Sequence, residues 1–557
     1  MKKIVSALTA ITLLGGFAFA QEYKTATLES PVGKISFGAW GRSTFEIGQE
    51  KSNTKIDVDG GAMDETYRNL LTAYNAADDA GKGVILSTYG LTEETITALN
   101  GFYGLETDTD STQNFIRMNP DWSYGCRVGF WIIGRTNDEH FGFDFNLDSD
   151  AGALFIHKLW DSDENEKDVN YHEDGKYAVA IGDQAKMWGL FDVKPLATQF
   201  KVAFGKMREQ VLRGSIGDFG QRESSDVKSE DDIFSEFWPV TGMFVSASGL
   251  KDTWLEGFYA AGCVDISGTL GINSTDTDNY DYMDMHDVFH NGQYGIGYTI
   301  PGIMQIKAQY WGDSITESNF RYAKSKYEAA RAAGFDRDDY YGRMEFGIDF
   351  LGFMGGANNF TEVDLEKTPN ANLIEIGFKV PIMGDEDLRE YDPETFYNWY
   401  SCIGTMGVIQ KGFILYKAHL WGGQGVSNLG KYSSGLVTLD AGDPADIFMA
   451  GFDALAEVCL NPFGNQNLFV GLSGNYNITA ADGDDSYWGD LKLRQHKAGA
   501  EIYIKKTFGA NNFIFAGLSY RYSKSTMDGT VKALPGDVSF ENAQHTFYAP
   551  IGIEMFF

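Results

Sequence analysis

The sequence AQHTFYAPIGIEMFF, residues 543–557, decides the fold of this chain. Apolar side chains recur at every second position from Phe547 to Phe557, whereas Gly552 and Glu554 lie between them. Successive side chains of a strand point to opposite faces, so a period of two predicts a strand with one apolar and one polar face. The strand is expected to end at the aromatic Phe557.

The same alternation recurs along the whole chain. It predicts a first strand from Lys34 to Gly48 and a hairpin over 126–148 that turns at Thr136 to Glu139. Further strands are expected at 176–190, 198–206, 242–248, 254–263, 293–300, 303–312, 341–350, 353–364, 372–380, 412–422, 447–460, 468–477, 497–506 and 513–523. With the terminal strand, the count is sixteen to eighteen and is expected to be even.

Short turns alternate with long connections between these strands. The first long connection, 49–125, exceeds an ordinary loop, so we expect it to cover or plug part of a mouth. Ala62 to Ala80 and Asn319 to Gly334 have helix-favouring composition, which predicts partly helical loops. Residues 381–411 break the rule, because a long connection falls where a short turn is expected; either strands hide near Cys402 to Gln410 or the strand register is wrong there.

The amino terminus has the form of a signal peptide. Lys2 and Lys3 precede an apolar stretch, and a small-x-small cleavage site lies at Ala18 to Ala20. We therefore expect a signal peptide over 1–20, a periplasmic lead-in over 21–33 and one barrel domain over 34–557. After Gln21 no run of about eighteen apolar residues occurs, so no transmembrane helix is expected.

These features together resemble the Gram-negative outer-membrane β-barrel porins. The resemblance implies an all-β fold: an antiparallel transmembrane β-barrel of sixteen to eighteen strands with long, partly helical extracellular loops. It implies a cell outer-membrane location, contact with outer-membrane lipid, and recognition by the barrel-assembly machinery through the strand that ends at Phe557. Passive diffusion of small hydrophilic solutes, without catalysis, cofactor, metal or nucleic-acid partner, is the implied function, and a homotrimer is a usual assembly.

Strand parity predicts which charged side chains face the lumen. Lumen-facing acids and bases balance, so the formal net charge of −33 is expected to come mainly from the loops. An acidic mouth concentrates cations over about 8–10 Å, which predicts a weak cation preference; the alternative is that loop acids aid solubility or bind divalent ions. The expected pore-lining residues are Arg42, Glu46, Arg127, Arg135, Asp144, Asp148, Lys201, Lys307, Arg343, Glu345 and Asp349.

The connection 207–241 is a candidate for a constriction. It begins with basic and ends with acidic residues, and it is the third external loop, which in the porins folds inward. An exposed loop is the alternative. The candidate residues are Arg208, Arg213, Arg222, Asp226, Asp231 and Asp232.

Four tryptophans, Trp40, Trp131, Trp188 and Trp311, fall on the lumen side by parity. Such rings can stack on sugar faces, as in sugar-selective porins. The interpretation that we favour is that they are girdle residues near strand ends or pack beneath an inserted loop.

Other motifs give weaker signals. His286 and His290 have the i, i+4 spacing of a metal pair but no evident third ligand, and the acidic run 482–485 lacks the pattern of a calcium loop. Cys126, Cys263, Cys402 and Cys459 are scattered and are expected to be free thiols. No nucleophile motif is present and no histidine is convincingly placed at a rim, so an outer-membrane protease or phospholipase is not expected.

Two other functions remain open. A surface-exposed adhesin or structural barrel would use the long loops to bind ligands, and a substrate-specific, sugar-type channel would use the aromatic residues. A plug-bearing transporter is disfavoured, because no large domain precedes Lys34.

Overall fold

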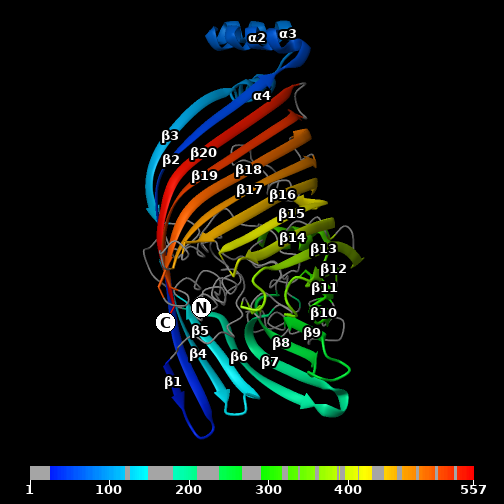
Figure 1. Ribbon diagram of the computed structural model, residues 1–557. Coiled ribbons are helices and arrows are strands. Elements are labelled where there is room, and N and C mark those ends of the chain that lie inside the picture. The colour runs from blue at the N-terminus through cyan, green and yellow to red at the C-terminus, as the bar shows by residue number, and fades with distance from the viewer. Residues whose placement is uncertain are drawn as a thin grey trace.

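The computed structural model describes residues 26–118, 126–148, 180–209, 212, 237–265, 290, 292–315, 324–336, 339–357, 363–364, 366–384, 388, 396–411, 413–428, 444–460, 467–483, 488–508, 512–531 and 536–556. Long antiparallel strands dominate these residues (Figure 1).

The strands that form the wall follow one another along the chain. They are β2 (Gly33–Asp59), β4 (Cys126–Thr136), β5 (Phe141–Asp148), β6 (Ala180–Val193), β7 (Thr198–Glu209), β8 (Phe237–Gly249), β9 (Phe258–Asp265), β10 (Gly292–Ile300), β11 (Met304–Ser314), β12 (Tyr340–Phe350), β13 (Ala371–Gly384), β14 (Phe396–Ile409), β15 (Ile414–Asn428), β16 (Pro444–Cys459), β17 (Leu468–Gly483), β18 (Trp488–Thr507), β19 (Phe513–Val531) and β20 (Asp537–Phe556).

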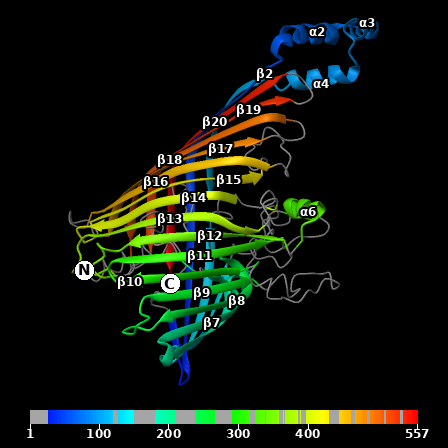
Figure 2. The same ribbon diagram turned by 90° about the vertical axis from the view of Figure 1, so that its right-hand side faces the viewer.

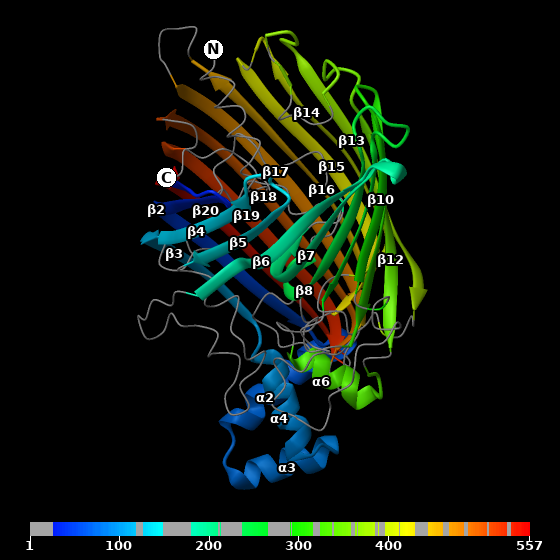
Figure 3. The same ribbon diagram turned by 90° about the horizontal axis from the view of Figure 1, so that it is seen from below.

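Strand β2 closes this wall into a ring. Along one edge it pairs with β20, from Trp40 opposite Phe556 to Asp59 opposite Asp537. Along the other edge it pairs with β4, and each strand from β4 to β20 pairs with the next. The ring therefore contains 18 antiparallel strands, which confirms the expected barrel at the upper end of the expected count. In Figures 1 and 3, β14–β18 lie on one side of the ring and β4–β8 on the other.

Two further strands pair with β2 outside the ring. The short β1 (Ala26–Glu29) pairs with its first residues. β3 (Thr107–Met118) pairs with Phe45 to Ile56, on the same edge as β4 but farther along. Within the expected first connection, 49–125, residues 49–59 and 107–118 are thus strand. Its polar sequence TDTDSTQN lacks the alternation that would have predicted β3.

The two faces of the wall differ in polarity as the alternation requires. On β2, Phe45 and Ile47 are exposed on the outer face, whereas Glu46 between them is fully buried on the inner face. The apolar outer band continues around the ring, for example at Phe346, Leu472 and Ile551. An outward apolar band with inward polar groups is the pattern of a barrel that spans a membrane.

The two ends of the barrel differ in their connections. At one end, here called the short-turn end, most strands are joined by a few residues, such as 137–140, 301–303 and 410–413. The other end carries the longer connections, including α6 (Lys324–Ala333), which lies within the helix expected from Asn319 to Gly334. Figure 2 shows α6 and the helices after β2 at this same end.

One strand was predicted wrongly. Residues 351–357 form turns rather than the start of a strand over 353–364, and the partner of β12 is β13. The interval 381–411, expected as one connection, contains the end of β13 and all of β14. Leu351 and Phe353 are two positions apart, but the adjacent pairs Phe353-Met354 and Gly355-Gly356 interrupt any alternation. Counting a strand there placed the interval 381–411 at the wrong end of the barrel.

Three helices form a small unit between β2 and β3, which we call the helical unit. They are α2 (Asp64–Ala76), α3 (Asp79–Tyr89) and α4 (Glu93–Tyr103), preceded by the 3-10 turn η1 (Gly61–Met63). A second 3-10 turn, η4 (Lys194–Leu196), joins β6 to β7. Asp78 and Thr92 cap α3 and α4 by accepting backbone N–H bonds from Gly81 and Thr95. None of the described helices is long and apolar enough to cross a membrane.

The helical unit has its own small core. Leu70 and Leu71 of α2 pack with Ile96 and Leu99 of α4, and all four side chains are buried. Phe102, at the end of α4, instead joins an apolar cluster on the inner face of the long-connection end.

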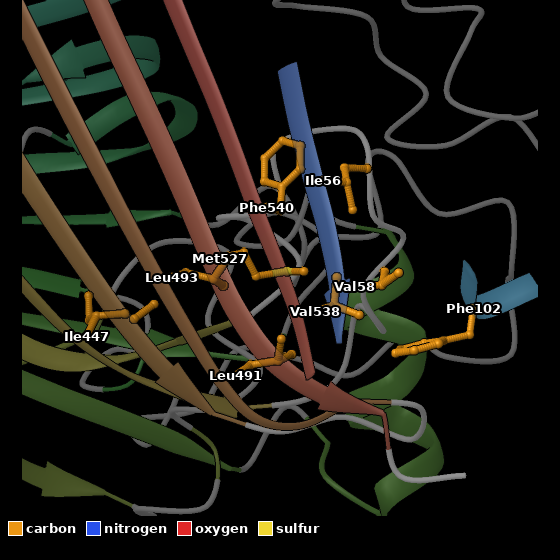
Figure 4. Close-up of a cluster of buried hydrophobic side chains, with 10 residues drawn as sticks. Ile56, Val58, Phe102, Ile447, Leu491, Leu493, Met527, Val538 and Phe540 are labelled. Carbon is orange, nitrogen blue, oxygen red and sulfur yellow. The ribbon is translucent and has the colours of Figure 1, made fainter. Parts of the chain in front are cut away.

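That cluster marks a reversal of polarity along the wall. Its inward residues on β2 and β20 include Ile56, Val58 and Phe540, and Phe102 lies beside Val58 at its edge (Figure 4). The outer face at this height is charged, because Lys55 pairs with Asp57 and Lys524 pairs with Glu541. Apolar groups inside and charges outside indicate that these strand ends project beyond the apolar band.

We predict that Phe102→Ala releases the helical unit from the wall. The side chain is 1% exposed, and truncating a buried Phe costs about 3–5 kcal/mol of packing energy. Limited proteolysis of the folded protein in detergent should cut within 61–106 faster than in the unchanged chain. Tyr89→Ala, at an exposed position of α3, is the matched control; equal cleavage of both variants would contradict this role of Phe102.

The junction of β2 with α2 predicts a pH dependence. The Gly60 N–H donates to Asp64 Oδ1 and Arg68 Nε donates to Asp64 Oδ2, both at 2.8 Å, which holds the pKa of Asp64 below its usual range. Tyr103 Oη donates to Asp64 Oδ1 at 3.0 Å, and burial, with this bond, raises the pKa of Tyr103 to about 12.

Because the pKa of Asp64 is lower in the folded helical unit than in the unfolded chain, the ionised carboxylate stabilises the unit at pH values above the ordinary Asp pKa of about 4. This stability is lost as the pH falls through the lower pKa of Asp64 in the folded unit. The helical circular-dichroism signal should therefore persist at neutral pH and weaken only in stronger acid. Asp64→Asn should weaken the signal already at pH 7, whereas Glu65→Gln, at an exposed neighbour, should not. A neutral-pH signal unchanged by Asp64→Asn would refute this account.

Candidate functional site

The candidate site is the inner face of the ring. Among the expected pore-lining residues, Arg42, Glu46, Lys307, Arg343, Glu345 and Asp349 are buried on the face opposite the apolar band. Arg135, Asp144 and Lys201 are half-buried on that face. Arg127 and Asp148 lie in β4 and β5, with side chains outside the described part of the structure.

A three-residue charge cluster joins β11, β12 and β13. Lys307 Nζ lies 2.8 Å from Asp349 Oδ2 and 3.0 Å from Glu375 Oε2, and all three side chains are buried. Asp349 lies directly opposite Glu375 in the strand register, so the lysine on the next strand bridges two facing carboxylates. A buried charge is tolerated where partners and hydrogen bonds satisfy it.

A second group lies farther along the same strands. Arg343 Nε donates to Glu345 Oε1 at 3.0 Å, and Gln309 Nε2 donates to Glu345 Oε2 at 3.1 Å. The Arg343 guanidinium also lies 3.7 Å from the ring centre of Trp311. Trp311 therefore orients an arginine by a cation–π contact.

Ion pairs continue on β5 and β6. Asp144 lies 2.8 Å from Arg135 and 3.8 Å from Lys186, and the Arg135 guanidinium lies 4.5 Å from the centre of the Trp188 ring. The buried Lys186 was not among the expected residues, although parity in the strand 176–190 could have identified it.

On β2, Glu46 lies 3.1 Å from Arg117 of β3 and 3.9 Å from Arg521 of β19. Arg117 was missed because β3 was not expected. These pairs place opposite charges next to one another, so much of the charge on the described inner wall is neutralised locally.

Two of the expected lumen tryptophans pack against glycines of the facing strand. Trp40 covers Gly129 and Trp131 covers Gly38, across the β2–β4 pairing. A Cβ added to Gly38 would lie 2.0 Å from the Trp131 ring, so glycine is needed for this close approach. Trp131 is 6% exposed, which leaves little of its ring face for a solute.

The connection after β7 enters the ring at its first described residue. Leu212 N–H donates to Gln309 Oε1 at 2.9 Å, and Gln309 is on the inner face of β11. The Leu212 side chain is buried with Phe244 of β8 and with Tyr400 and Trp421 of β14 and β15. This cluster joins inner faces from separate parts of the ring.

The structure does not describe the side chains of the six constriction candidates. Arg208 is in β7, but its side chain lies outside the described residues, as do Arg213, Arg222, Asp226, Asp231 and Asp232 altogether.

The weaker motifs contribute no site. His290 is buried and stacks on Tyr340 at 3.3 Å between ring centres, whereas His286 lies outside the described residues. In the part of the chain that the structure describes, no group of three or more metal-ligating side chains converges. Cys263, Cys402 and Cys459 are buried free thiols, which confirms the expectation for these three; the Cys126 side chain lies outside the described part.

Comparisons with known proteins find similarity only among solved structures. No family model and no curated protein matches the chain. It is similar to OpdL of Pseudomonas aeruginosa at 8% identity, covering 92% of this chain and 99% of OpdL with a TM-score of 0.33. It is similar to OccK8 (OprE) of the same organism at 10% identity, covering 91% of this chain and 98% of OccK8 with a TM-score of 0.34. It is similar to the outer-membrane-expressed OmpT of Vibrio cholerae at 10% identity, covering 95% of this chain and 100% of OmpT with a TM-score of 0.32.

We predict that Lys307→Met destabilises the barrel strongly. Removing the lysine leaves Asp349 and Glu375 facing each other while buried, and breaking one partner of a buried pair costs about 3–5 kcal/mol. Lys367→Met is the control: Lys367 pairs with Asp364 at the surface with 84% of its side chain exposed, where a pair contributes about 0–1 kcal/mol. Urea unfolding in detergent, followed by tryptophan fluorescence, measures both. Similar midpoints would show that the cluster contributes little.

Proposed function

We propose that this chain is an outer-membrane channel through which small hydrophilic solutes diffuse passively. The supporting observation is the opposite polarity of the two faces of a closed ring: exposed apolar side chains outside, and ion-paired charges inside. An 18-stranded ring of this kind is wide enough to hold water. Such a function needs no catalytic group, because the bore and the wall charges discriminate between solutes.

The proposed orientation puts the short-turn end in the periplasm and the helical unit outside the cell, because periplasmic turns of such barrels are short. Residues 1–20 would be removed as a signal peptide, leaving 21–33 as a periplasmic lead-in. The barrel-assembly machinery would recognise the strand ending at Phe557, and the assembly that we propose is a homotrimer.

The charged inner-wall residues, from Arg42 and Glu46 to Asp349, are the proposed pore lining. The inward position of Leu212 supports a constriction formed by the connection after β7, with Arg208, Arg213, Arg222, Asp226, Asp231 and Asp232 as its candidate charged residues. A sugar-type channel is less well supported, because Trp131 packs against the wall rather than facing the interior.

A weak preference for cations follows from the distribution of charge. The formal net charge is −33, whereas acids on the described inner wall are largely paired with bases. The unpaired negative charge therefore belongs mainly to the connections, where it would concentrate cations at the mouth.

A surface-exposed adhesin is the second candidate. The helical unit favours it, because α2 and α3 stand beyond the strand ends in Figures 1 and 2 and would be accessible to a ligand.

Planar-bilayer recording of the mature protein tests the proposal. We expect discrete open steps, and a reversal potential in a salt gradient that indicates a small preference for cations. Asp231→Asn with Asp232→Asn should reduce that preference, whereas Asp57→Asn, on the exposed outer face of β2, should not. A silent barrel would refute the channel, and a preference for anions would refute the charge argument alone.

A further inference from the structure

One connection at the short-turn end is unlike its neighbours. Residues 351–370, between β12 and β13, are far longer than the turns on either side at 301–303 and 410–413. We call the described residues 351–357, 363–364 and 366–370 the periplasmic lobe. Leu351, Met354 and Val363 of this lobe are 0%, 1% and 7% exposed, although a connection at a barrel rim normally lies in water.

The buried side chains of the lobe contact the inner face of the wall. They form one apolar cluster with Ala371 and Leu373 of β13, Met406 and Val408 of β14, and Leu415 of β15. All five wall residues lie at the short-turn ends of their strands, on the face that carries Glu375 and Lys417 farther along. The periplasmic lobe therefore folds inward across the rim rather than away from it.

The wall beneath the lobe is complementary to it. On β13 and β15 the next inner-face positions from this rim include the charged residues Glu375, Lys379 and Lys417, whereas the positions that the lobe covers are apolar. If the lobe were absent, water would contact these apolar side chains, and the barrel would lose about 25 cal/mol of hydrophobic stabilisation for each Å² of apolar surface uncovered. The sequence of three strands is thus suited to a permanently seated lobe.

Backbone contacts fasten the lobe on both sides. Leu351 N–H donates to the Ile303 carbonyl at 2.8 Å, and Lys411 N–H donates to the Pro369 carbonyl at 2.7 Å. Gly302 approaches Gly356 so closely that a Cβ on Gly302 would lie 2.8 Å from the Gly356 Cα. At Gly355, with φ at +65°, a Cβ would lie 2.0 Å from the Thr368 hydroxyl oxygen. Contacts to the turns before and after it indicate a fixed element.

We propose that the periplasmic lobe is a fixed constriction at the periplasmic exit of the channel. It occupies the β13–β15 side of the exit and thereby limits the size of the solutes that can pass. This inference rests on the proposed channel function and adds a second point of size selection, separate from the connection after β7. The lobe limits solutes by the space that it occupies in the exit. Charge is not part of this proposal, because the buried contacts of the lobe with the wall are apolar.

Two matched variants test the lobe. Met354→Asp puts a charge into the buried cluster and should expel the lobe from the wall, because an unpaired charge cannot stay in an apolar cluster. Phe353→Asp adds the same charge at a neighbouring position that is 68% exposed and should leave the lobe seated. Single-channel conductance, and the size of the largest polyethylene glycol that enters from the periplasmic side, should rise for Met354→Asp only.

A third variant covers the case in which Met354→Asp fails to fold. In it, an Asn-Gly turn replaces residues 351–370, and Leu373→Thr, Met406→Thr and Leu415→Thr make the uncovered wall polar. Its conductance should also rise. The unchanged protein gives an independent measurement, because a polymer of intermediate size should enter from the extracellular side and be excluded from the periplasmic side.

The outcomes separate the two proposals. If the unchanged protein is silent in bilayers, the channel function fails and the constriction fails with it. If the unchanged protein conducts, but folded variants without a seated lobe have the same conductance and polymer cutoff, the constriction is refuted and the channel stands. Equal polymer access from both sides of the unchanged protein would also count against it.

Discussion

The pairing of β2 along both of its edges is the interaction on which the rest of this structure depends. Every strand with an apolar outer face needs all its backbone N–H and C=O groups paired, because hydrocarbon offers them no partners. β2 meets β20 over Trp40 to Asp59 and β4 over Gly33 to Ser43, so that the last strand of the chain closes on the first long one. Without this contact the sheet would have two open edges.

Closure creates an interior, and the interior determines how charge is arranged. Charged groups that face inward meet other strands of the ring, so Lys307 can reach Asp349 and Glu375, and Glu46 can reach Arg117 and Arg521. Some aromatic rings pack over glycines, as Trp131 does over Gly38, and some guanidinium groups pack over aromatic rings, as Arg343 does over Trp311. These contacts hold the inward side chains close to the wall. On the described inner wall, acids therefore lie next to bases that offset much of their charge.

The two ends of the barrel carry different additions. At the long-connection end the strands extend past the apolar band, reverse their polarity and support the helical unit through Phe102. At the other end, the periplasmic lobe turns inward and covers apolar positions of β13, β14 and β15. In both places a segment that joins two strands supplies apolar side chains to an inner face that is otherwise polar. The described inner face of the ring is therefore covered in part by connections as well as formed by strands.

The sequence by itself determined the fold class, the approximate strand count and the inward or outward direction of residues such as Phe45, Glu46 and Lys307, because side-chain alternation is a local property of a strand. It could not determine β3, whose polar residues do not alternate. Nor could it show that Leu351 and Met354 are buried by packing on other strands, because apolar residues in a turn and in a strand both favour burial. It also could not show that Lys307 lies between two carboxylates, that Trp131 covers Gly38, or that Leu212 reaches Gln309. Only the tertiary structure decided these contacts, because strand register and ring closure bring together residues that are far apart in the chain.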